Sequence, residues 1–309
     1  METKCRVCGG EVARMFDVPE MRYGTGETFA YAQCAGCEGL QIVTIPADLG
    51  RYYPASYHAL ARPEPVGLRR AVRRWRDAYA VWDRGVIGWL LYARWPEPAI
   101  RALAGLELSR ARRVLDVGCG PGILARRLLD LGFENVMGID PYADAPDVVR
   151  GDITAVDGVW DVIMFHHALE HVPDPLASLS AAMERLAPDG AILVRMPVVP
   201  CAVWDRYGVA WVQLDAPRHL HVLSLRGLET LAGRVGLVVN AVKYDSTAFQ
   251  FWGSEQVRMG IPLESARSYA VDPAQSVFRP AQVRAWARES RRLNVVGRGD
   301  QVMVVLRRG

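Results

Sequence analysis

A glycine-rich turn in the middle of the chain constrains the fold more than any other feature. Gly118, Gly120 and Gly122 follow an apolar run that ends at Val117 and precede a helical stretch that begins near Ile123. Glycine has no Cβ, so such a turn lets the backbone approach a ligand closely. Apolar runs and helical stretches go on alternating after the turn, which indicates βαβ units and a mostly parallel sheet.

We expect a Rossmann-like α/β domain with seven strands. No obvious crossover helix directly precedes the final strand, so we expect the last two strands to close the sheet as an antiparallel hairpin. The expected strands cover residues 113–117, 136–139, 147–149, 161–165, 191–196, 237–244 and 302–306.

An acidic residue lies in or directly after each of the first three strands. Asp116 stands two residues before the first glycine, Asp140 ends the second strand, and Asp152 follows the third. The carboxyl ends of parallel strands lie at one edge of the sheet, where open α/β sheets bind ligands. An acid before the first glycine suits a cationic ligand better than the pyrophosphate of a dinucleotide. A tight turn with no ligand is the lesser alternative.

This segment resembles the first motif of class I S-adenosylmethionine-dependent methyltransferases, and the resemblance runs from Arg112 to the end of the chain. It implies that one set of residues holds the methionine part, Asp140 the ribose, and a third set the adenine. The methionine set is Asp116, Gly118, Gly120 and Gly122, and the adenine set is Asp152 with the backbone of Ile153. We place His166, at the end of the fourth strand, with the cofactor-binding residues.

Histidines cluster in the loops after the fourth and fifth expected strands, where a general base could reach the acceptor. Methyl transfer requires the acceptor atom to lie in line with the sulfonium and to lose its proton. Histidine titrates near neutrality and can remove that proton. His219, after the fifth strand, is our first choice of general base, and His167, after the fourth, is the second. His171 is a further candidate, with a purely structural role as an equal alternative.

The stretch from His167 to His171 also matches the H-x-x-E-H pattern of zinc peptidases. That pattern needs a sustained helix, whereas Pro173 and Pro175 follow almost at once, so we set it aside. In the methyltransferase family, the matching stretch from Leu169 to Pro175 lines the cofactor pocket.

Residues 211–224 resemble a block of saccharide and natural-product methyltransferases, and residues 249–256 have the same character. Within the first block, Arg218 is a candidate to bind an anionic group of the substrate. The alternative is that Arg218 and His219 only tie their loop to the sheet.

Two C-x-x-C pairs near the N-terminus, Cys5 with Cys8 and Cys34 with Cys37, predict one tetrahedral structural Zn²⁺ site. The unit resembles the zinc-binding N-terminal part of deoxysugar C-methyltransferases, including the aromatic turn at residues 52–57. Those enzymes have a further C-terminal domain that this chain is too short to contain, so we favour methylation of oxygen. We expect Cys119 and Cys201 to be reduced and free of metal.

Between these parts, residues 65–104 predict a basic amphipathic helix. Its apolar residues recur at steps of three and four, and arginines between Arg69 and Arg76 occupy much of the rest. We expect a connecting helix that packs on the main domain with solvated arginines. Peripheral contact with a membrane surface or an acidic substrate is the lesser alternative. The apolar residues are Leu68, Val72, Trp75, Tyr79, Trp82 and Val86.

The expected organisation is a zinc module (1–60), the connector (61–104) and a methyltransferase domain (105–309). The formal net charge of +3 is too balanced to indicate DNA or RNA as a partner. We therefore expect a cytoplasmic S-adenosylmethionine-dependent methyltransferase that acts on a saccharide or sugar-containing small molecule, as in polysaccharide biosynthesis. An RNA methyltransferase with a zinc-ribbon docking module and a non-catalytic zinc-ribbon scaffold are the alternatives. The oligomeric state does not follow from the sequence.

Overall fold

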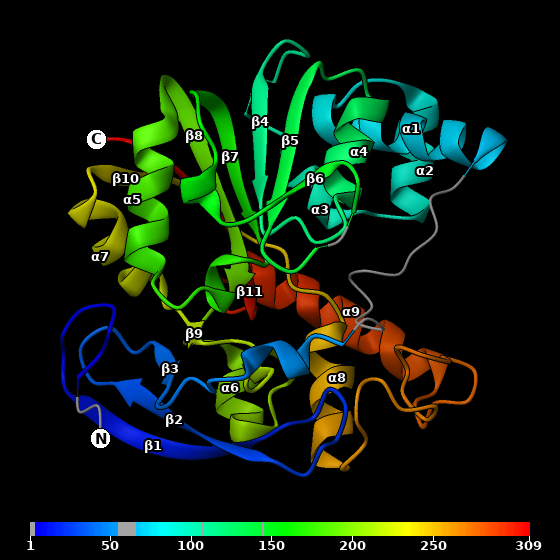
Figure 1. The fold of residues 1–309 in the computed structure, drawn as a ribbon. Helices are drawn as coiled ribbons and strands as arrows, with labels where there is room; N and C mark the ends of the chain where they lie inside the picture. Colours follow the sequence, from blue (N-terminus) through cyan, green and yellow to red (C-terminus); the bar gives the residue numbers. More distant parts are fainter. Residues whose placement is uncertain (1–3, 55–65, 107, 144) are drawn as a thin grey trace.

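The computed structural model describes residues 4–54, 66–106, 108–143 and 145–309. A seven-stranded sheet forms the larger part, and a four-stranded sheet lies beneath it in Figure 1. The strand order of the larger sheet is β10-β11-β8-β7-β4-β5-β6. Its strands are β4 (Arg113–Val117), β5 (Asn135–Asp140), β6 (Val148–Arg150), β7 (Trp160–His166), β8 (Leu186–Pro197), β10 (Leu237–Tyr244) and β11 (Gln301–Arg308).

The expected Rossmann-like sheet is confirmed. Strands β4 to β8 pair in parallel, and β11 runs antiparallel to both β8 and β10. The expected antiparallel pairing of the last two strands is confirmed, but their connection is no short turn, because α8 (Phe249–Arg258) and α9 (Pro280–Val295) lie between β10 and β11. Helix α9 buries only Ser290 and Leu293 among its residues, so its sequence has little of the apolar periodicity that signals a helix.

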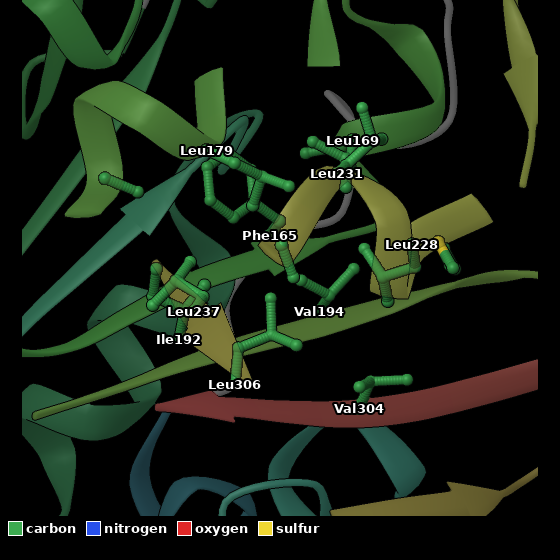
Figure 2. Close-up of a cluster of buried hydrophobic side chains, with 14 of the residues drawn as sticks. Phe165, Leu169, Leu179, Ile192, Val194, Leu228, Leu231, Leu237, Val304 and Leu306 are labelled. Carbon is green, nitrogen blue, oxygen red and sulfur yellow. The ribbon is translucent and has the colours of Figure 1, made fainter. Parts of the chain in front are cut away.

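Helices cover both faces of the large sheet. On one face, α5 (Pro175–Arg185) and α7 (Leu225–Arg234) pack on β7, β8 and β11 through buried apolar side chains, which Figure 2 shows. On the other face, α1 (Gly67–Trp82), α3 (Pro98–Arg101) and α4 (Ile123–Asp130) enclose a second apolar cluster. Each fully buried Leu or Phe contributes about 1.5–3 kcal/mol relative to an exposed one. The labelled residues of Figure 2 are Phe165, Leu169, Leu179, Ile192, Val194, Leu228, Leu231, Leu237, Val304 and Leu306.

The smaller sheet joins the N-terminal segment to a strand in the second half of the chain. Strands β1 (Val12–Pro19), β2 (Thr28–Cys34) and β3 (Leu40–Ile42) pair antiparallel, and β3 pairs with β9 (His221–Val222). The N-terminal unit is thereby attached to the loop that follows β8. The boundaries at residues 60 and 61, and Ala55, Ser56 and Tyr57 of the aromatic turn, lie outside the described residues.

The expected connector helix is divided into α1, α2 (Val86–Arg94) and α3, and part of its expected apolar face lies in solvent. Asp83 has a left-handed backbone (φ 53°) and ends α1, so Val86 begins α2 instead of sharing the face of α1. Leu68 and Trp75 are exposed, although we expected them to pack on the domain. The inward face of α1 carries Asp77, Ala80 and Val81.

A buried ion pair explains this orientation. The Arg127 guanidinium of α4 donates to both carboxylate oxygens of Asp77 at 2.9 Å. A buried carboxylate needs such a partner, so the charged face of α1 turns inward at this point. Among the described residues, no helix combines the length and apolar character needed to cross a bilayer.

Candidate functional site

The glycine turn is built where side chains would not fit. Gly118, Gly120 and Gly122 have φ of 70°, 54° and 75°, a region that L-residues rarely adopt. A Cβ on Gly118 would lie 2.5 Å from the Ala168 side chain, and one on Gly122 would lie 2.9 Å from Val148. The turn therefore requires glycine, and it ends at the first residue of α4 as expected.

Asp116 lies buried in β4 just before the turn. Its Oδ1 has no hydrogen-bond partner among the residues that the structure describes. Burial, and the nearby charge of Asp140, raise the pKa of Asp116 to about 7. A buried carboxylate oxygen without a donor is costly, so this atom is suited to a cationic or hydrogen-bond-donating ligand.

Asp140 and Asp152 shape the same edge of the sheet. The backbone N–H of Gly120 donates to Asp140 Oδ2 at 2.9 Å, and those of Tyr142 and Ala143 donate to Oδ1 at 2.8 and 2.9 Å. Asp140 thus fixes the glycine turn, while its remaining lone pairs are free to bind a ligand. Asp152 accepts from the backbone N–H of Thr154 at 2.8 Å and caps the short helix that begins at the buried Ile153.

The two histidines at the end of β7 share one arginine. Arg195 donates to His166 Nε2 at 3.2 Å and to His167 Nε2 at 2.8 Å. A guanidinium can only donate, so both Nε2 atoms are unprotonated and both Nδ1 atoms carry the proton. The Nδ1–H of His167 then donates to Glu170 at 3.0 Å, whereas the buried Nδ1 of His166 has no partner among the described residues.

These contacts weaken His167 as a general base. Its Nε2 lone pair is occupied by the guanidinium, and burial together with the Arg195 charge lowers its pKa to about 3. Burial and Arg195 also hold the pKa of His166 well below its usual value. His166 keeps an Nδ1–H donor that a ligand could accept.

His171 and His219 lie together, with ring centroids 4.7 Å apart. The carbonyl oxygens of Arg218 and Gln213 lie 2.9 Å from His171 Nδ1 and 2.7 Å from His219 Nδ1. A carbonyl can only accept, so both Nδ1 atoms carry the proton and both Nε2 atoms keep a lone pair. Burial lowers the pKa of His171 to about 4 and also lowers that of His219. Both rings are neutral at pH 7 and can accept a proton through Nε2.

Aromatic and acidic side chains surround this pair. The Tyr53 hydroxyl lies 3.0 Å from His171 Nδ1, and the Tyr53 ring stacks on Tyr142 with centroids 5.1 Å apart. Glu170 is buried and its Oε2 has no partner among the described residues. One carboxylate oxygen of Glu170 and one nitrogen each of His171 and His219 lie within 4.8 Å of one another.

Arg218 is fully buried in an ion-pair network, although we considered it for an anionic substrate group. It donates to Glu20 at 3.0 Å and to Asp215 at 2.8 Å. These ion pairs within the protein therefore already offset the cost of removing the Arg218 guanidinium from water. The arrangement fits the alternative structural role, in which Arg218 holds the loop before His219. The Tyr31 hydroxyl of β2 adds a hydrogen bond to the His219 carbonyl at 2.7 Å.

The four cysteines of the two C-x-x-C pairs converge. The Cys5 and Cys37 sulfurs lie 3.7 Å apart, the Cys8 and Cys34 sulfurs lie 3.4 Å apart, and all four lie within 4.8 Å of one another. Four sulfurs at about 2.3 Å from one Zn²⁺ have similar mutual separations. The backbone N–H of Gly36 donates to Cys34 Sγ at 3.2 Å, which suits a thiolate ligand. Cys119 and Cys201 lie outside this group.

The structure thus gathers the expected cofactor residues at the carboxyl edge of the sheet and brings His171 to His219. Sequence reasoning missed Glu20, Tyr31, Tyr53 and Glu170 as supports of this site. Tyr53 had a signal, because it belongs to the aromatic turn after the second cysteine pair. Glu20 and Tyr31 had none, since their partners lie more than 180 residues away in the sequence.

Comparison with known proteins finds methyltransferases similar to part of the larger domain. Residues 92–242 match a family described as a methyltransferase domain. The ubiquinone biosynthesis O-methyltransferase of Psychrobacter cryohalolentis is 34% identical over 102 residues, which cover 27% of this chain and 40% of the relative. The enzyme of the same name from Cereibacter sphaeroides is 29% identical over 135 residues, covering 35% of this chain and 51% of the relative. The chain spans about half the length of these curated relatives or less.

Similar solved structures are more distant. A complex between the Haloferax volcanii Trm112 methyltransferase activator and a methyltransferase is similar with 18% identity and a TM-score of 0.47, covering 75% of this chain and 97% of that one. CalO1, a methyltransferase in calicheamicin biosynthesis bound to SAH, has 22% identity and a TM-score of 0.38, covering 51% of this chain and 52% of that one. TM-scores this low do not bear on function.

Proposed function

We propose that the protein is a class I S-adenosylmethionine-dependent methyltransferase that transfers a methyl group to an oxygen atom of a small molecule, since residues 92–242 match a family described as a methyltransferase domain. One observation carries the proposal: the unpartnered, buried Oδ1 of Asp116 lies at the head of the glycine turn. S-adenosylmethionine supplies the electrophilic methyl group when bound. Its ammonium group is the cation that this carboxylate lacks.

The remaining cofactor contacts follow from the same edge of the sheet. The glycine turn holds the methionine part, and Asp140 accepts from the ribose hydroxyls. Asp152 and the backbone of Ile153 hold the adenine, and the free Nδ1–H of His166 donates to the bound cofactor. Support comes from the way Asp140 is fixed by three backbone N–H groups, which preorganises it for a charge-assisted hydrogen bond.

His219 is the proposed general base. Its Nδ1–H is anchored on the Gln213 carbonyl, so Nε2 is left to take the proton of an acceptor hydroxyl. His171, whose Nδ1–H is anchored on the Arg218 carbonyl, is the second candidate. Glu170 lies close enough to stabilise the imidazolium that forms on proton transfer. His167 is set aside as the base, because Arg195 occupies its lone pair.

We propose a saccharide or sugar-containing molecule as the acceptor. The support is the resemblance of residues 211–224 to saccharide and natural-product methyltransferases, together with the aromatic pair Tyr53 and Tyr142, because aromatic faces pack against apolar ring surfaces. Oxygen as the methylated atom is supported by the curated relatives, which are named O-methyltransferases.

Transfer of labelled methyl groups tests this function. The protein is incubated with methyl-labelled S-adenosylmethionine and a panel of sugar nucleotides, glycan intermediates, phenols and total RNA. We expect label in a sugar-containing acceptor, and no label with Asp116→Ala. Label in RNA alone would show that the saccharide proposal is wrong. Absence of cofactor binding in calorimetry would instead identify a non-catalytic scaffold.

We also propose one structural Zn²⁺ on Cys5, Cys8, Cys34 and Cys37. A site with four sulfur ligands leaves no open position for a substrate, so the metal would stabilise the N-terminal unit. Elemental analysis of the purified protein should find one zinc per chain. Cys34→Ser should lower that content, whereas Cys119→Ser should keep it. Full zinc content in Cys34→Ser would exclude this ligand set.

A further inference from the structure

The α1–α2 pair exposes an apolar surface that the proposed methyl transfer does not use. Figure 1 shows both helices at one edge of the molecule, beyond α4 and away from the smaller sheet. Helix α2 has the sequence VIGWLLYAR, and only Gly88 is buried. Its exposed side chains are Val86 (73%), Ile87 (58%), Trp89 (51%) and Leu90 (55%).

The contact between the two helices sets the direction of this surface. A Cβ on Gly88 would lie 2.5 Å from the Trp75 carbonyl oxygen and 2.7 Å from the Tyr79 side chain, so α2 meets α1 at Gly88. At 3.6 residues per turn, Val86 and Leu90 lie on the side of α2 opposite Gly88, and Trp89 lies beside them. The apolar face of α2 therefore points away from the protein.

Helix α1 adds two exposed apolar side chains of its own. Leu68 and Trp75 are seven residues apart, share one side of α1, and are 76% and 50% exposed. The opposite side of α1 carries the buried Asp77 that pairs with Arg127. Trp95, directly after α2, is also exposed and lies under the Arg94 guanidinium. Exposed clusters of aromatic and aliphatic side chains mark interaction sites in water-soluble proteins.

Cations border this apolar surface. Arg69, Arg74 and Arg84 are exposed, and none of them has a carboxylate partner among the described residues. Other arginines of α1 differ, since Arg70 and Arg73 both pair with Asp130. Tryptophan and leucine side chains enter the headgroup region of a bilayer, while unpaired arginines attract anionic lipids. A protein partner would need only the apolar side chains or only the arginines, whereas an anionic bilayer binds both.

We infer that the α1–α2 pair docks on the surface of an anionic lipid bilayer, with Trp75, Trp89 and Leu90 inserted and Arg69, Arg74 and Arg84 on the phosphates. The protein would thus be held at the membrane interface by these two helices. This inference stands independently of the methyl transfer proposed above, because no residue of the cofactor or acceptor site takes part.

Vesicle sedimentation with the full-length protein tests the inference. We expect binding to phosphatidylcholine vesicles that contain phosphatidylglycerol, weaker binding without it, and loss of the difference at high salt. Trp89→Ser combined with Leu90→Ser should weaken binding about tenfold or more, because it removes inserted apolar area. Arg69→Gln combined with Arg74→Gln should weaken it about fivefold per arginine at low salt.

Matched variants on α9 provide the controls. Val295→Ser removes an exposed apolar side chain and Arg284→Gln with Arg288→Gln removes exposed cations, and neither should change vesicle binding. Failure of the unmodified protein to bind the anionic vesicles would overturn the inference. Sedimentation equilibrium tests whether a second copy of the chain covers this surface instead. Absent vesicle binding, together with a dimer that Trp89→Ser combined with Leu90→Ser dissociates, would also overturn the inference.

Discussion

The two halves of the proposed active site are built in different ways. On the cofactor side, Asp116, the glycine turn and Asp140 lie within 25 residues of sequence, and backbone N–H groups fix the geometry. On the acceptor side, Tyr53, Glu170, His171 and His219 come from three separate segments that are held together by buried side chains. A local backbone motif is visible in a sequence, whereas a site made by tertiary packing is visible only in the fold.

Because the two sides of the site are built from different segments, acceptor-side variants should change catalysis without changing cofactor binding. His219→Asn should lower kcat by about 10²- to 10⁴-fold, the usual contribution of a positioned general base. The asparagine amide can still donate to the Gln213 carbonyl, so the loop should keep its position. Cofactor affinity from calorimetry should stay within twofold or so of the unmodified protein.

His171→Asn serves as the matched control for that experiment. If His219 is the base, the loss of kcat should be clearly smaller in His171→Asn. Equal kcat in His219→Asn and the unmodified protein would remove His219 from the mechanism. A loss of cofactor affinity in His219→Asn would show that the two halves of the site are not separate.

The second prediction concerns the support of the acceptor side. Arg218→Met should lower the free energy of unfolding by about 3–5 kcal/mol, because the buried carboxylates of Glu20 and Asp215 would both lose their ion pair with this guanidinium. Urea denaturation measures this loss. Arg292→Met removes an exposed arginine paired with Glu289 on α9 and should leave the urea midpoint unchanged. Similar midpoints for the two variants would contradict the role given to Arg218.

The difference between local backbone motifs and tertiary packing also explains what the sequence could predict. The seven strands, the antiparallel last strand and the carboxyl-edge placement of Asp116, Asp140 and Asp152 follow from periodicity and turn chemistry. The orientation of α1 does not, because the buried Asp77–Arg127 pair outweighs the apolar periodicity of Leu68 and Trp75. The network around Arg218 and the rejection of His167 depend on partners that the sequence does not bring together.

Stability should depend on pH through the buried histidines of the acceptor side. Burial lowers the pKa of His171 from 6.5 to about 4, so the unfolded chain binds a proton there more readily than the folded protein. The contribution of neutral His171 to the free energy of unfolding is complete above pH 6.5 and is lost as the pH falls from 6.5 towards 4. Between pH 7 and pH 5, His171 alone should account for about 2 kcal/mol of lost unfolding free energy.

Urea titrations of His171→Gln at the two pH values provide the measurement. The glutamine does not titrate, so the variant should lose about 2 kcal/mol less than the unmodified protein over this range. The carbonyl contact of residue 171 can be kept by the amide, which limits other changes. An identical pH dependence in both proteins would mean that His171 is not buried in its neutral form.

The cofactor side should respond to pH in the same direction, with a smaller effect. Burial and Asp140 raise the pKa of Asp116 to about 7, so most of the free protein holds this carboxyl neutral at pH 6. A cationic ligand favours the ionised form, and its binding at pH 6 should therefore release a proton from Asp116. Cofactor affinity should rise about tenfold from pH 6 to pH 8, and this rise should be absent in Asp116→Asn. Calorimetry in buffers of different ionisation enthalpy counts the released proton, and a count of zero at pH 6 would place the ammonium group away from Asp116.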